Sequence, residues 1–474
     1  ASQNIDCLLQ MTTMKSFSGS QDVFDWLSGF INFERGLSAK AFRLDRMHIL
    51  ADLAGHPERC APVIHVAGSK GKGSITTMIA AMLHEAGYRT GRYVSPHVTE
   101  YRERVSRSEC FFDESVYAAA GEELRNLVTK AVQEYPDLFS PESPEGEAPT
   151  FFELLTLYFF LCCRQDRCEV MVVETGMGGR LDATNIVDPL VSVISPIELE
   201  HTQYLGNTIA AIAGEKAGII KPGRPVVLSE QRPEALDVFR KTAAERGSPV
   251  WYIPDLAEVS DLRVSRNGTR FFINIKDVPQ SPLQFDECSK TLGIELSLIG
   301  AIQAQNATQA LTAVRAAFPA IPVETLLRGL KATQLPARFE GVHESPAVII
   351  DGAHTPRSVN LCTETFVNLF GKDNILLFGC AADKDSAAMA HILIPHFAHI
   401  IITKPGSFKQ SEPERIIKDF TETKEGFTVD IEGIPDTKKA IERAYCLAQT
   451  LQKPLLVTGS FYLAAEVRSF FASY

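Results

Sequence analysis

The chain lacks the features that mark secreted, membrane-spanning and disulfide-rich proteins. Its 10 cysteines include no Cys-x-x-Cys pair, and a chain of 474 residues can bury enough apolar surface to fold without disulfides. The N-terminus shows no charged segment followed by an apolar one, so we expect no secretory signal. The longest predominantly apolar run, Leu154–Cys163, is too short to span a bilayer. We therefore expect reduced thiols and a cytoplasmic location.

An excess of positive charge is also missing. Lysine and arginine total 47 and aspartate and glutamate total 58, which gives a net charge of −11. Such a chain is not expected to bind nucleic acid or an anionic membrane. Internal repeats and low-complexity tracts are absent, and the length predicts two or three domains. Apolar residues make up 45% of the chain and charged residues 22%, as in ordinary globular proteins.

Short apolar runs alternate with helical patterns along most of the chain. This alternation predicts an α/β fold with parallel sheets, in which ligand groups lie beyond the carboxyl ends of the strands. One stretch differs, because Asn267-Gly268 between two strand-like runs predicts a hairpin and hence a small antiparallel patch. The apolar runs are Val170–Val173, Val191–Ile194, Val226–Leu228, Val348–Ile350, Ile375–Phe378, Ile400–Ile402 and Leu455–Val457.

The most informative segment is residues 65–74, with the sequence His-Val-Ala-Gly-Ser-Lys-Gly-Lys-Gly-Ser. The apolar run Pro62–Ala67 predicts a buried strand, and the spacing of apolar residues from Ile75 onward predicts a helix. A glycine-rich turn between them can bind phosphate through backbone N–H groups and the helix dipole, with a lysine as point charge. The predicted phosphate-binding residues are Gly68, Ser69, Lys70, Gly71, Lys72, Gly73 and Ser74.

This segment does not match the usual Walker pattern, because Val66 and Gly73 stand where that pattern requires glycine and Ser/Thr. The alternative is a glycine-rich turn whose lysines are incidental. With the phosphate loop as its centre, we predict a large P-loop-type ATPase domain over residues 1–333. A linker at 334–338, which contains Pro336, precedes a smaller Rossmann-like α/β domain over 339–474.

The order of motifs resembles that of the folylpolyglutamate synthase/dihydrofolate synthase family, a branch of the Mur-ligase superfamily. The resemblance extends from about residue 24 to the C-terminus. Each motif alone is modest, but their shared order is specific. It implies an ATP-dependent ligase that joins L-glutamate to a folate, to dihydropteroate or to both through an acyl phosphate. The motifs are residues 65–74, 95–97, 150–153, 174–185, 201–208, 215–223, 351–356 and 458–460.

Phosphoryl transfer requires neutralisation of charge on the phosphates, which calls for a lysine and Mg²⁺. The resemblance implies catalytic roles for Lys72, Lys216 and His201. It also implies that Mg²⁺ is approached by Ser95, Glu174, His201 and a carbamate that Lys216 forms with CO₂. Without the resemblance, a histidine in the position of His201 is more often a loop residue than a metal ligand. The alternative for Lys216 is a solvated lysine at the end of a helix.

The resemblance places the pteroate part of the substrate against two short segments. Aromatic rings can stack on a flat heterocycle, and carboxylates can accept its N–H groups. Phe151 also follows the apolar spacing of a helix, so core packing is its alternative, and Glu153 has the alternative of a charge in a first helical turn. The predicted substrate residues are Thr150, Phe151, Phe152, Glu153, Leu181, Asp182 and Ala183.

For the other side of the nucleotide, the resemblance implies contacts from Asn306 to adenine, Arg338 to phosphate and Asp351 to ribose, with His354 nearby. Asp351 has the alternative of a turn residue before Gly352. The chain departs from the family pattern at Lys70, Glu200, Ile302, Ala337 and Thr355. None of these departures removes a charged group that the chemistry needs.

Two other functions stay open at this stage. One is a Mur-type ligase for a different carboxylate, such as a cell-wall precursor; residues 150–153, residues 181–185 and Gly73 argue against it. The other is a nucleotide-gated binding protein without ligase turnover, against which the intact Lys72 and Glu174 argue. We expect small-molecule substrates, ATP and Mg²⁺, no nucleic-acid or membrane partner, and a monomer.

Overall fold

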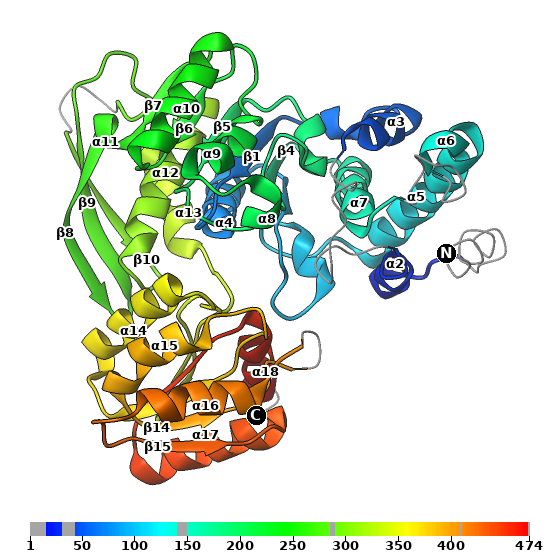
Figure 1. Cartoon of the computed structure of the whole chain (residues 1–474). Coiled ribbons are helices and arrows are strands. Elements are labelled where there is room, and N and C mark those ends of the chain that lie inside the picture. The colour runs from blue at the N-terminus through cyan, green and yellow to red at the C-terminus, as the bar shows by residue number, and fades with distance from the viewer. Residues whose placement is uncertain (1–15, 31–42, 140–148, 285–289, 407–409, 473–474) are drawn as a thin grey trace.

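The computed structural model describes residues 16–30, 43–139, 149–284, 290–406 and 410–472. Two α/β units, each built on its own large sheet, lie one against the other (Figure 1). The chain leaves the first unit after α13 (Val323–Ala332) and enters the second at β11 (Glu340–Glu344). We call these the N-terminal and C-terminal units.

The N-terminal unit is built on a seven-stranded sheet with the order β3-β2-β4-β1-β5-β6-β7. All neighbours are parallel except β3, which pairs antiparallel with β2 at one edge. The predicted parallel sheet is therefore confirmed apart from this edge. The strands are β1 (Val63–Ala67), β2 (Thr90–Tyr93), β3 (Val105–Arg107), β4 (Val170–Glu174), β5 (Val191–Ile194), β6 (Val226–Leu228) and β7 (Val250–Tyr252).

Helices cover both faces of this sheet. Successive residues of a strand point to opposite faces, so Met171 and Val173 of β4 pack with α5 and α7, whereas Val170 and Val172 pack with α4 and α12. The helices of this unit are α2 (Ser20–Leu27), α3 (Asp45–Leu53), α4 (Lys72–Glu85), α5 (Glu114–Glu134), α6 (Pro136–Phe139), α7 (Phe151–Gln165), α8 (Thr202–Leu205), α9 (Ile209–Ala217), α10 (Pro233–Glu245), α11 (Ile253–Leu256), α12 (Ile302–Ala317) and α13.

The predicted antiparallel patch is a three-stranded sheet of order β10-β9-β8 at the side of the N-terminal unit. Its strands are β8 (Ala257–Ser265), β9 (Gly268–Ile275) and β10 (Thr291–Leu296). Gly268 has φ +129°, and a Cβ there would lie 2.0 Å from the Leu296 carbonyl oxygen. Glycine is therefore required at the hairpin that the Asn-Gly pair predicts.

The C-terminal unit holds a six-stranded sheet of order β11-β12-β16-β13-β14-β15, parallel except for β11. One face packs on α14, α15 and α16, and the other on α17 and α18. The remaining elements are β12 (Ala347–Ile350), β13 (Asn374–Phe378), β14 (Phe397–Ile402), β15 (Asp430–Gly433), β16 (Leu455–Thr458), α14 (Pro356–Phe370), α15 (Ser386–Leu393), α16 (Pro413–Thr423), α17 (Thr437–Leu451) and α18 (Phe461–Ala472).

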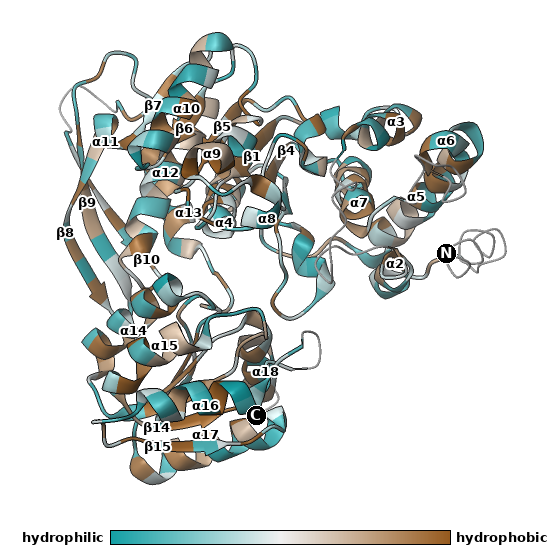
Figure 2. Ribbon diagram, in the orientation of Figure 1, coloured by the Kyte–Doolittle hydropathy of each residue, from teal (hydrophilic) through white to brown (hydrophobic). Residues whose placement is uncertain are grey.

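The hydropathy of the elements follows this layering. The inner strands of both large sheets carry hydrophobic colour, and helices at the periphery show mixed or hydrophilic colour (Figure 2). All five residues of β1 are buried, as a strand covered on both faces requires. Within the described ranges, no helix is long and apolar enough to cross a bilayer.

Helix α13 packs on α4 through Gly329, and this contact provides a test of the fold. A Cβ at position 329 would lie 2.5 Å from the Met82 Cα and 2.8 Å from the Ala81 carbonyl oxygen. Because both atoms belong to the backbone, we predict that Gly329→Ala destabilises the protein by about 1–3 kcal/mol. The measurement is the midpoint of thermal unfolding, followed by circular dichroism.

The matched control is Gly214→Ala in α9, where an added Cβ meets no atom within 4 Å. Since alanine favours a helix over glycine, this variant is expected to match or slightly exceed the stability of the parent chain. Equal loss of stability in both variants would contradict the proposed close packing of α13 on α4.

Candidate active site

A cleft of about 1660 Å³ lies between the two units. One wall is the phosphate loop, and the other is made by loops that follow β12, β13 and β16. Ligand groups are expected at such carboxyl ends of parallel strands. Sequence-predicted residues that line the cleft are Ser69, Lys70, Gly71, Lys72, Gly73, Ser74, Ser95, Thr150, Phe152, Glu153, Glu174, Leu181, Asp182, Ala183, His201, Asn306, Arg338, Asp351 and His354.

The phosphate loop joins β1 to α4, and two of its glycines are required by close approach. Gly68 has φ +142°, and a Cβ there would lie 1.8 Å from the Ser195 Oγ. Gly71 has φ +87°, precedes the first residue of α4, and would place a Cβ 2.7 Å from the Asn306 Oδ1. The loop therefore lies directly against the end of β5 and against α12. It presents the free N–H groups of the first turn of α4 to the cleft.

Two lysines meet at one backbone oxygen of this loop. The Nζ of Lys72 donates to the Gly68 carbonyl oxygen at 3.0 Å, and the Nζ of Lys216 donates to the same oxygen at 2.8 Å. Lys216 also donates to the Glu200 Oε1 at 3.1 Å, and its side chain is only 1% exposed. Burial, together with the charge of Lys72, lowers the pKa of Lys216 to about 8. A neutral fraction of this amine is therefore available near neutral pH.

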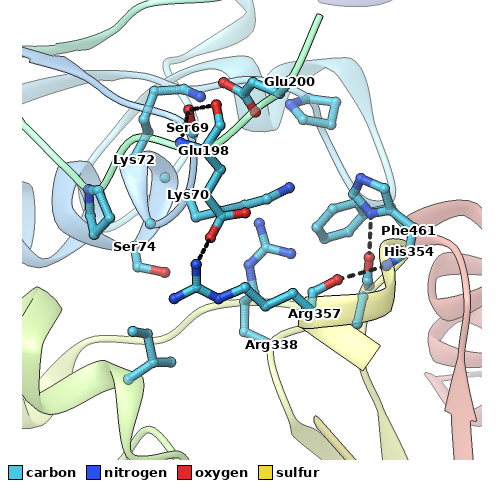
Figure 3. Close-up of a pocket in the computed structure, with 18 of the residues that line it drawn as sticks. Ser69, Lys70, Lys72, Ser74, Glu198, Glu200, Arg338, His354, Arg357 and Phe461 are labelled. Carbon is cyan, nitrogen blue, oxygen red and sulfur yellow. Dashed lines mark hydrogen bonds and ion pairs between the residues drawn. The ribbon is translucent and has the colours of Figure 1, made fainter. Parts of the chain in front are cut away.

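Lys70 is directed differently from the other two lysines. Its side chain extends into the cleft between the two units in Figure 3. Burial lowers its pKa, while the carboxylates of Glu198 and Glu200 oppose that effect. The cleft thus holds positive charge although the chain as a whole is acidic.

Glu174 ends β4 at the floor of the cleft. It is 2% exposed, and burial raises the pKa of its carboxyl to about 7 against the opposing charge of Lys72. Its Oε2 accepts a hydrogen bond from the Ser95 N–H at 3.1 Å. A Cβ at Gly73 would lie 3.5 Å from the same oxygen, so Glu174 directly adjoins the phosphate loop.

The donor set around Glu174 suits a hard cation shared with a nucleotide. In the part of the chain that the structure describes, no group of three or more His, Cys, Asp or Glu could hold a metal ion alone. Mg²⁺ commonly uses one or two carboxylates and takes its other ligands from water and phosphate. Glu174 and the Ser95 hydroxyl, next to the phosphate loop, fit that type of site. His201 borders the same cleft with a left-handed backbone, φ +47°.

Glu153 is engaged by protein groups on both of its oxygens. Its carboxylate accepts from the Arg46 Nε at 3.0 Å and Nη2 at 3.1 Å, and from the Thr150 N–H at 2.8 Å. Thr150 in turn caps α7 by accepting from the Glu153 N–H. This capping box and ion pair shape the start of α7. The structure therefore fits the alternative role of Glu153, a charge in the first turn of a helix, better than the role of a free acceptor for substrate. Sequence reasoning missed Arg46, which is fully buried.

Asp182 is likewise occupied by its own loop. It accepts hydrogen bonds from the Met177 N–H at 2.9 Å, the Thr184 N–H at 3.0 Å and the Thr184 hydroxyl. The Thr184 oxygen lies 2.8 Å from the Nε2 of His65 in β1. Since that hydroxyl donates to Asp182, it accepts from a neutral His65 protonated at Nε2. Leu181 and Ala183 form part of the cleft wall. The hydrogen bonds from Asp182 through Thr184 to His65 attach this wall to the central strand of the sheet.

The two predicted phenylalanines take different positions. Phe152 lines the cleft, and a Cβ at Gly176 would lie 2.4 Å from its ring. Phe151 is 1% exposed and packs in the core, with its ring centroid 6.1 Å from that of Tyr101. Core packing, the alternative that its helical spacing suggests, accounts for the buried position of Phe151, and its contact with substrate stays a prediction.

In the C-terminal unit, Asp351 holds its loop by accepting from the N–H groups of Phe339 and Ala353, both at 2.8 Å. The Arg338 guanidinium lies 4.1 Å from the ring centroid of Phe461. His354 places its Nδ1 2.8 Å from the Gly352 carbonyl oxygen, and burial lowers its pKa to about 4. The neutral ring therefore donates from Nδ1.

Figure 3 shows Arg338 and His354 across the cleft from the phosphate loop. It also shows two residues that sequence reasoning missed, Glu198 and Arg357, which form an ion pair between the units. The available signals were weak: Glu198 lies within three residues of His201, and Arg357 follows the 351–356 motif.

Comparisons with known proteins agree with this geometry. The Mur ligase middle domain matches residues 66–314, and the Mur ligase glutamate ligase domain matches residues 337–461. A dihydrofolate synthase/folylpolyglutamate synthase of Bacillus subtilis is 32% identical, over 95% of this chain and 99% of that protein.

Two solved structures are also similar. Mycobacterium tuberculosis folylpolyglutamate synthase, complexed with ADP and AMPPCP, superposes with a TM-score of 0.82 at 28% identity, over 95% of this chain and 98% of that one. A complex of FPGS with AMPPCP and folate gives a TM-score of 0.77 at 28% identity, over 95% and 99% of the two chains.

The buried histidine of β1 gives a pH prediction. Burial lowers the pKa of His65 to about 3, well below the value of 6.5 for an exposed histidine. Below pH 6.5 the unfolded chain gains a proton there that the folded chain does not, so stability is lost as pH falls from about 6.5 toward 3. The slope approaches 1.4 kcal/mol per pH unit.

The variant His65→Gln keeps a side-chain N–H near Thr184 but cannot titrate. Between pH 7.5 and pH 5.5 we expect it to lose about 1.4 kcal/mol less stability than the parent chain in urea unfolding. Parallel losses in the two proteins would show that His65 is accessible to protons in the folded state.

Proposed function

This chain belongs to the folylpolyglutamate synthase/dihydrofolate synthase family of Mur ligases, and from that premise we propose its reaction and the roles of its residues. The enzyme is an ATP-dependent ligase that forms an amide between L-glutamate and a folate or dihydropteroate. The observation that carries this proposal is one cleft lined by Lys72 and Glu174 of the N-terminal unit and by Arg338 and His354, which lie across it from the phosphate loop in Figure 3.

The reaction has two steps. A carboxylate oxygen of the folate or dihydropteroate attacks the γ-phosphorus of ATP, which releases ADP and leaves an acyl phosphate. The amine of glutamate then attacks the carbonyl carbon, loses a proton, and expels inorganic phosphate. Lys72 and the first N–H groups of α4 neutralise the phosphate charge, which is the main catalytic demand of phosphoryl transfer.

The proposed Mg²⁺ site is the Glu174 carboxylate with the Ser95 hydroxyl. A Mg²⁺ ion held by these two groups would neutralise negative charge on the phosphates during transfer. Because Lys72 and Glu174 both line the cleft and interact electrostatically, each can contact the same phosphate group. His201 lies at the border of the cleft, and we propose it as a further residue that approaches the Mg²⁺.

Lys216 is proposed to react with CO₂ to form a carbamate. Its nitrogen attacks the carbon of CO₂ and loses a proton, which exchanges the ammonium for a carboxylate-like group. Burial and the lowered pKa favour the neutral amine that this addition needs. The modified side chain, which lies beside Glu200 and the Gly68 carbonyl, would supply an oxygen ligand to a cation.

The C-terminal unit is proposed to cover the nucleotide. Asn306 adjoins the phosphate loop from α12 and would contact adenine. Arg338 would contact phosphate. Asp351 accepts two backbone N–H groups and, since a carboxylate has about four acceptor sites, can also accept a ribose hydroxyl. His354 would stand beside them. Residues 334–338 act as the linker about which the two units close.

The pteroate end is proposed to bind against Phe152, Leu181 and Ala183. Because Glu153 and Asp182 are satisfied by protein groups, they support this wall rather than carry the main substrate contact. Both reactions share one carboxylate-activation step, so one phosphate site serves dihydropteroate and folate alike. We expect a cytoplasmic monomer with small-molecule substrates.

The proposal is tested with purified enzyme, ATP, Mg²⁺, L-glutamate and either dihydropteroate or tetrahydrofolate. ADP release should require both glutamate and a pteroate compound, and mass spectrometry should show one added glutamate. Lys72→Met is expected to lose more than about nine-tenths of the rate, which corresponds to about 1.4 kcal/mol of barrier.

Product from only one acceptor would restrict the enzyme to one of the two reactions. ADP release without any pteroate or glutamate requirement would contradict the ligase assignment. A Lys72→Met enzyme with nearly full activity would remove the lysine from its proposed contact with the phosphates.

For Lys216, we expect Lys216→Ala to be inactive and to regain part of its activity with added short carboxylates, which replace the carbamate oxygens. The parent enzyme should gain activity from bicarbonate after dialysis against CO₂-free buffer. Lys216→Arg is the matched control, because it keeps a cation that cannot form a carbamate. Full activity of Lys216→Ala without additive would refute the carbamate.

A further inference from the structure

One ion pair crosses the cleft beside the phosphate loop. Glu198 follows β5 in the N-terminal unit, and Arg357 lies in the first turn of α14 in the C-terminal unit. The Nη1 of Arg357 lies 2.5 Å from the Oε1 of Glu198. A dashed line marks this ion pair in Figure 3. The Glu198 side chain is 18% exposed and that of Arg357 is 65% exposed. The arginine therefore reaches across the cleft to a largely buried carboxylate.

Glu198 is tied to the phosphate loop by backbone hydrogen bonds. The hydroxyl of Ser69 donates to the Glu198 carbonyl oxygen at 3.2 Å and accepts from the Glu198 N–H at 3.0 Å. The Ser69 N–H also donates to the Pro196 carbonyl oxygen at 3.0 Å. Because these bonds link residues 196–198 to Ser69, a displacement of Glu198 moves the phosphate loop as well.

Arg357 is tied equally closely to the nucleotide side of the C-terminal unit. Thr355 caps α14, and the Ser358 hydroxyl accepts from the N–H groups of His354 at 3.2 Å and Thr355 at 3.0 Å. Arg357 thus shares one hydrogen-bonded turn with His354. The ion pair connects this turn to the phosphate loop on the opposite wall.

The charge of Glu198 adds a second constraint. Its carboxylate interacts electrostatically with Lys70, which projects into the same part of the cleft. An unpaired carboxylate at this position, where the Glu198 side chain is only 18% exposed, would repel a bound triphosphate. Arg357 offsets that repulsion.

We propose that Arg357 and Glu198 are positioning residues for the nucleotide, whose ion pair holds the phosphate loop against the α14 turn and neutralises the carboxylate next to the triphosphate. The inference rests on the proposed ATP-dependent function. Neither side chain acts on the reacting atoms, so loss of the pair weakens ATP binding while the chemical step is largely preserved. The expected signature is a raised KM for ATP with little change in kcat.

A double-mutant cycle tests the pair in the full-length enzyme. Arg357→Gln, which leaves the Glu198 carboxylate unpaired beside the triphosphate, is expected to raise the KM for ATP about two- to five-fold, the range for a partly exposed ion pair. Glu198→Gln removes that carboxylate together with the ion pair and is expected to raise the KM for ATP less. Since both remove the same interaction, the double variant should show no further rise. The exchanged pair Arg357→Glu with Glu198→Arg should return the KM for ATP to within about two-fold of the parent value.

The matched control is Arg266→Gln. Arg266 also joins the two units, because its Nη2 donates to the Leu369 carbonyl oxygen at 3.1 Å, but no phosphate-loop residue takes part. We expect its KM for ATP to be unchanged. The dissociation constant of a fluorescent ATP analogue, measured without folate or glutamate, tests the ion pair independently of ligase activity.

Several outcomes would overturn the inference. Effects of the single variants that multiply in the double variant would show that the two residues act separately. An increase confined to the KM for glutamate would make Arg357 an amino-acid contact. An equal rise in Arg266→Gln would point to general loosening between the units.

Discussion

The convergence of two ammonium groups on the Gly68 carbonyl oxygen is the constraint on which the rest of the site depends. Lys72 comes from the start of α4 and Lys216 from α9, so one backbone oxygen joins the helix after β1 to the helix that follows α8. Burial and the repulsion between two cations at one neutral acceptor both lower the pKa of Lys216. The proposed phosphate contact and carbamate would relieve this imbalance. Burial also opposes charge on the acidic side, because it raises the pKa of the nearby Glu174.

The direction of the parallel strands explains the architecture of the cleft. Both large sheets direct the carboxyl ends of their parallel strands toward the space between the units, so the loops after β1, β4 and β5 face those after β12, β13 and β16. Each wall is stiffened by side chains that bind backbone rather than ligand, as Asp351 does in one unit and Asp182 in the other. Because internal hydrogen bonds hold each wall, the shape of the cleft depends on the relative position of the two units, and the Arg357–Glu198 ion pair joins them.

Periodicity in the sequence predicted the inner strands well and the outer ones poorly. Val191–Ile194 and Val226–Leu228 coincide with β5 and β6, because a strand buried on both faces is apolar throughout. β2 reads Thr-Gly-Arg-Tyr and β15 reads Asp-Ile-Glu-Gly, which carry no such signal, since their pairing is decided by neighbouring strands. The site residues also fall into those that a local pattern predicts and those that depend on distant parts of the chain. The glycine and lysine pattern of the phosphate loop is local, whereas the burial of Phe151 and the pairing of Glu153 with Arg46, 107 positions away, are not.

The sequence alone determined the class of fold, the phosphate loop, the hairpin at Gly268 and the order of motifs that implies a ligase, because each depends on residues adjacent in the chain. Tertiary structure decided which side chains are free to meet a ligand. Asp182 and Glu153 have suitable chemistry by sequence, yet each already accepts three hydrogen bonds from protein groups, which leaves little acceptor capacity for a ligand. Arg357 has no distinguishing local pattern, and its significance arises only because α14 faces residues 196–198 across the cleft. The physical reason is that chemistry is a property of a residue, whereas burial, pairing and pKa are properties of its surroundings.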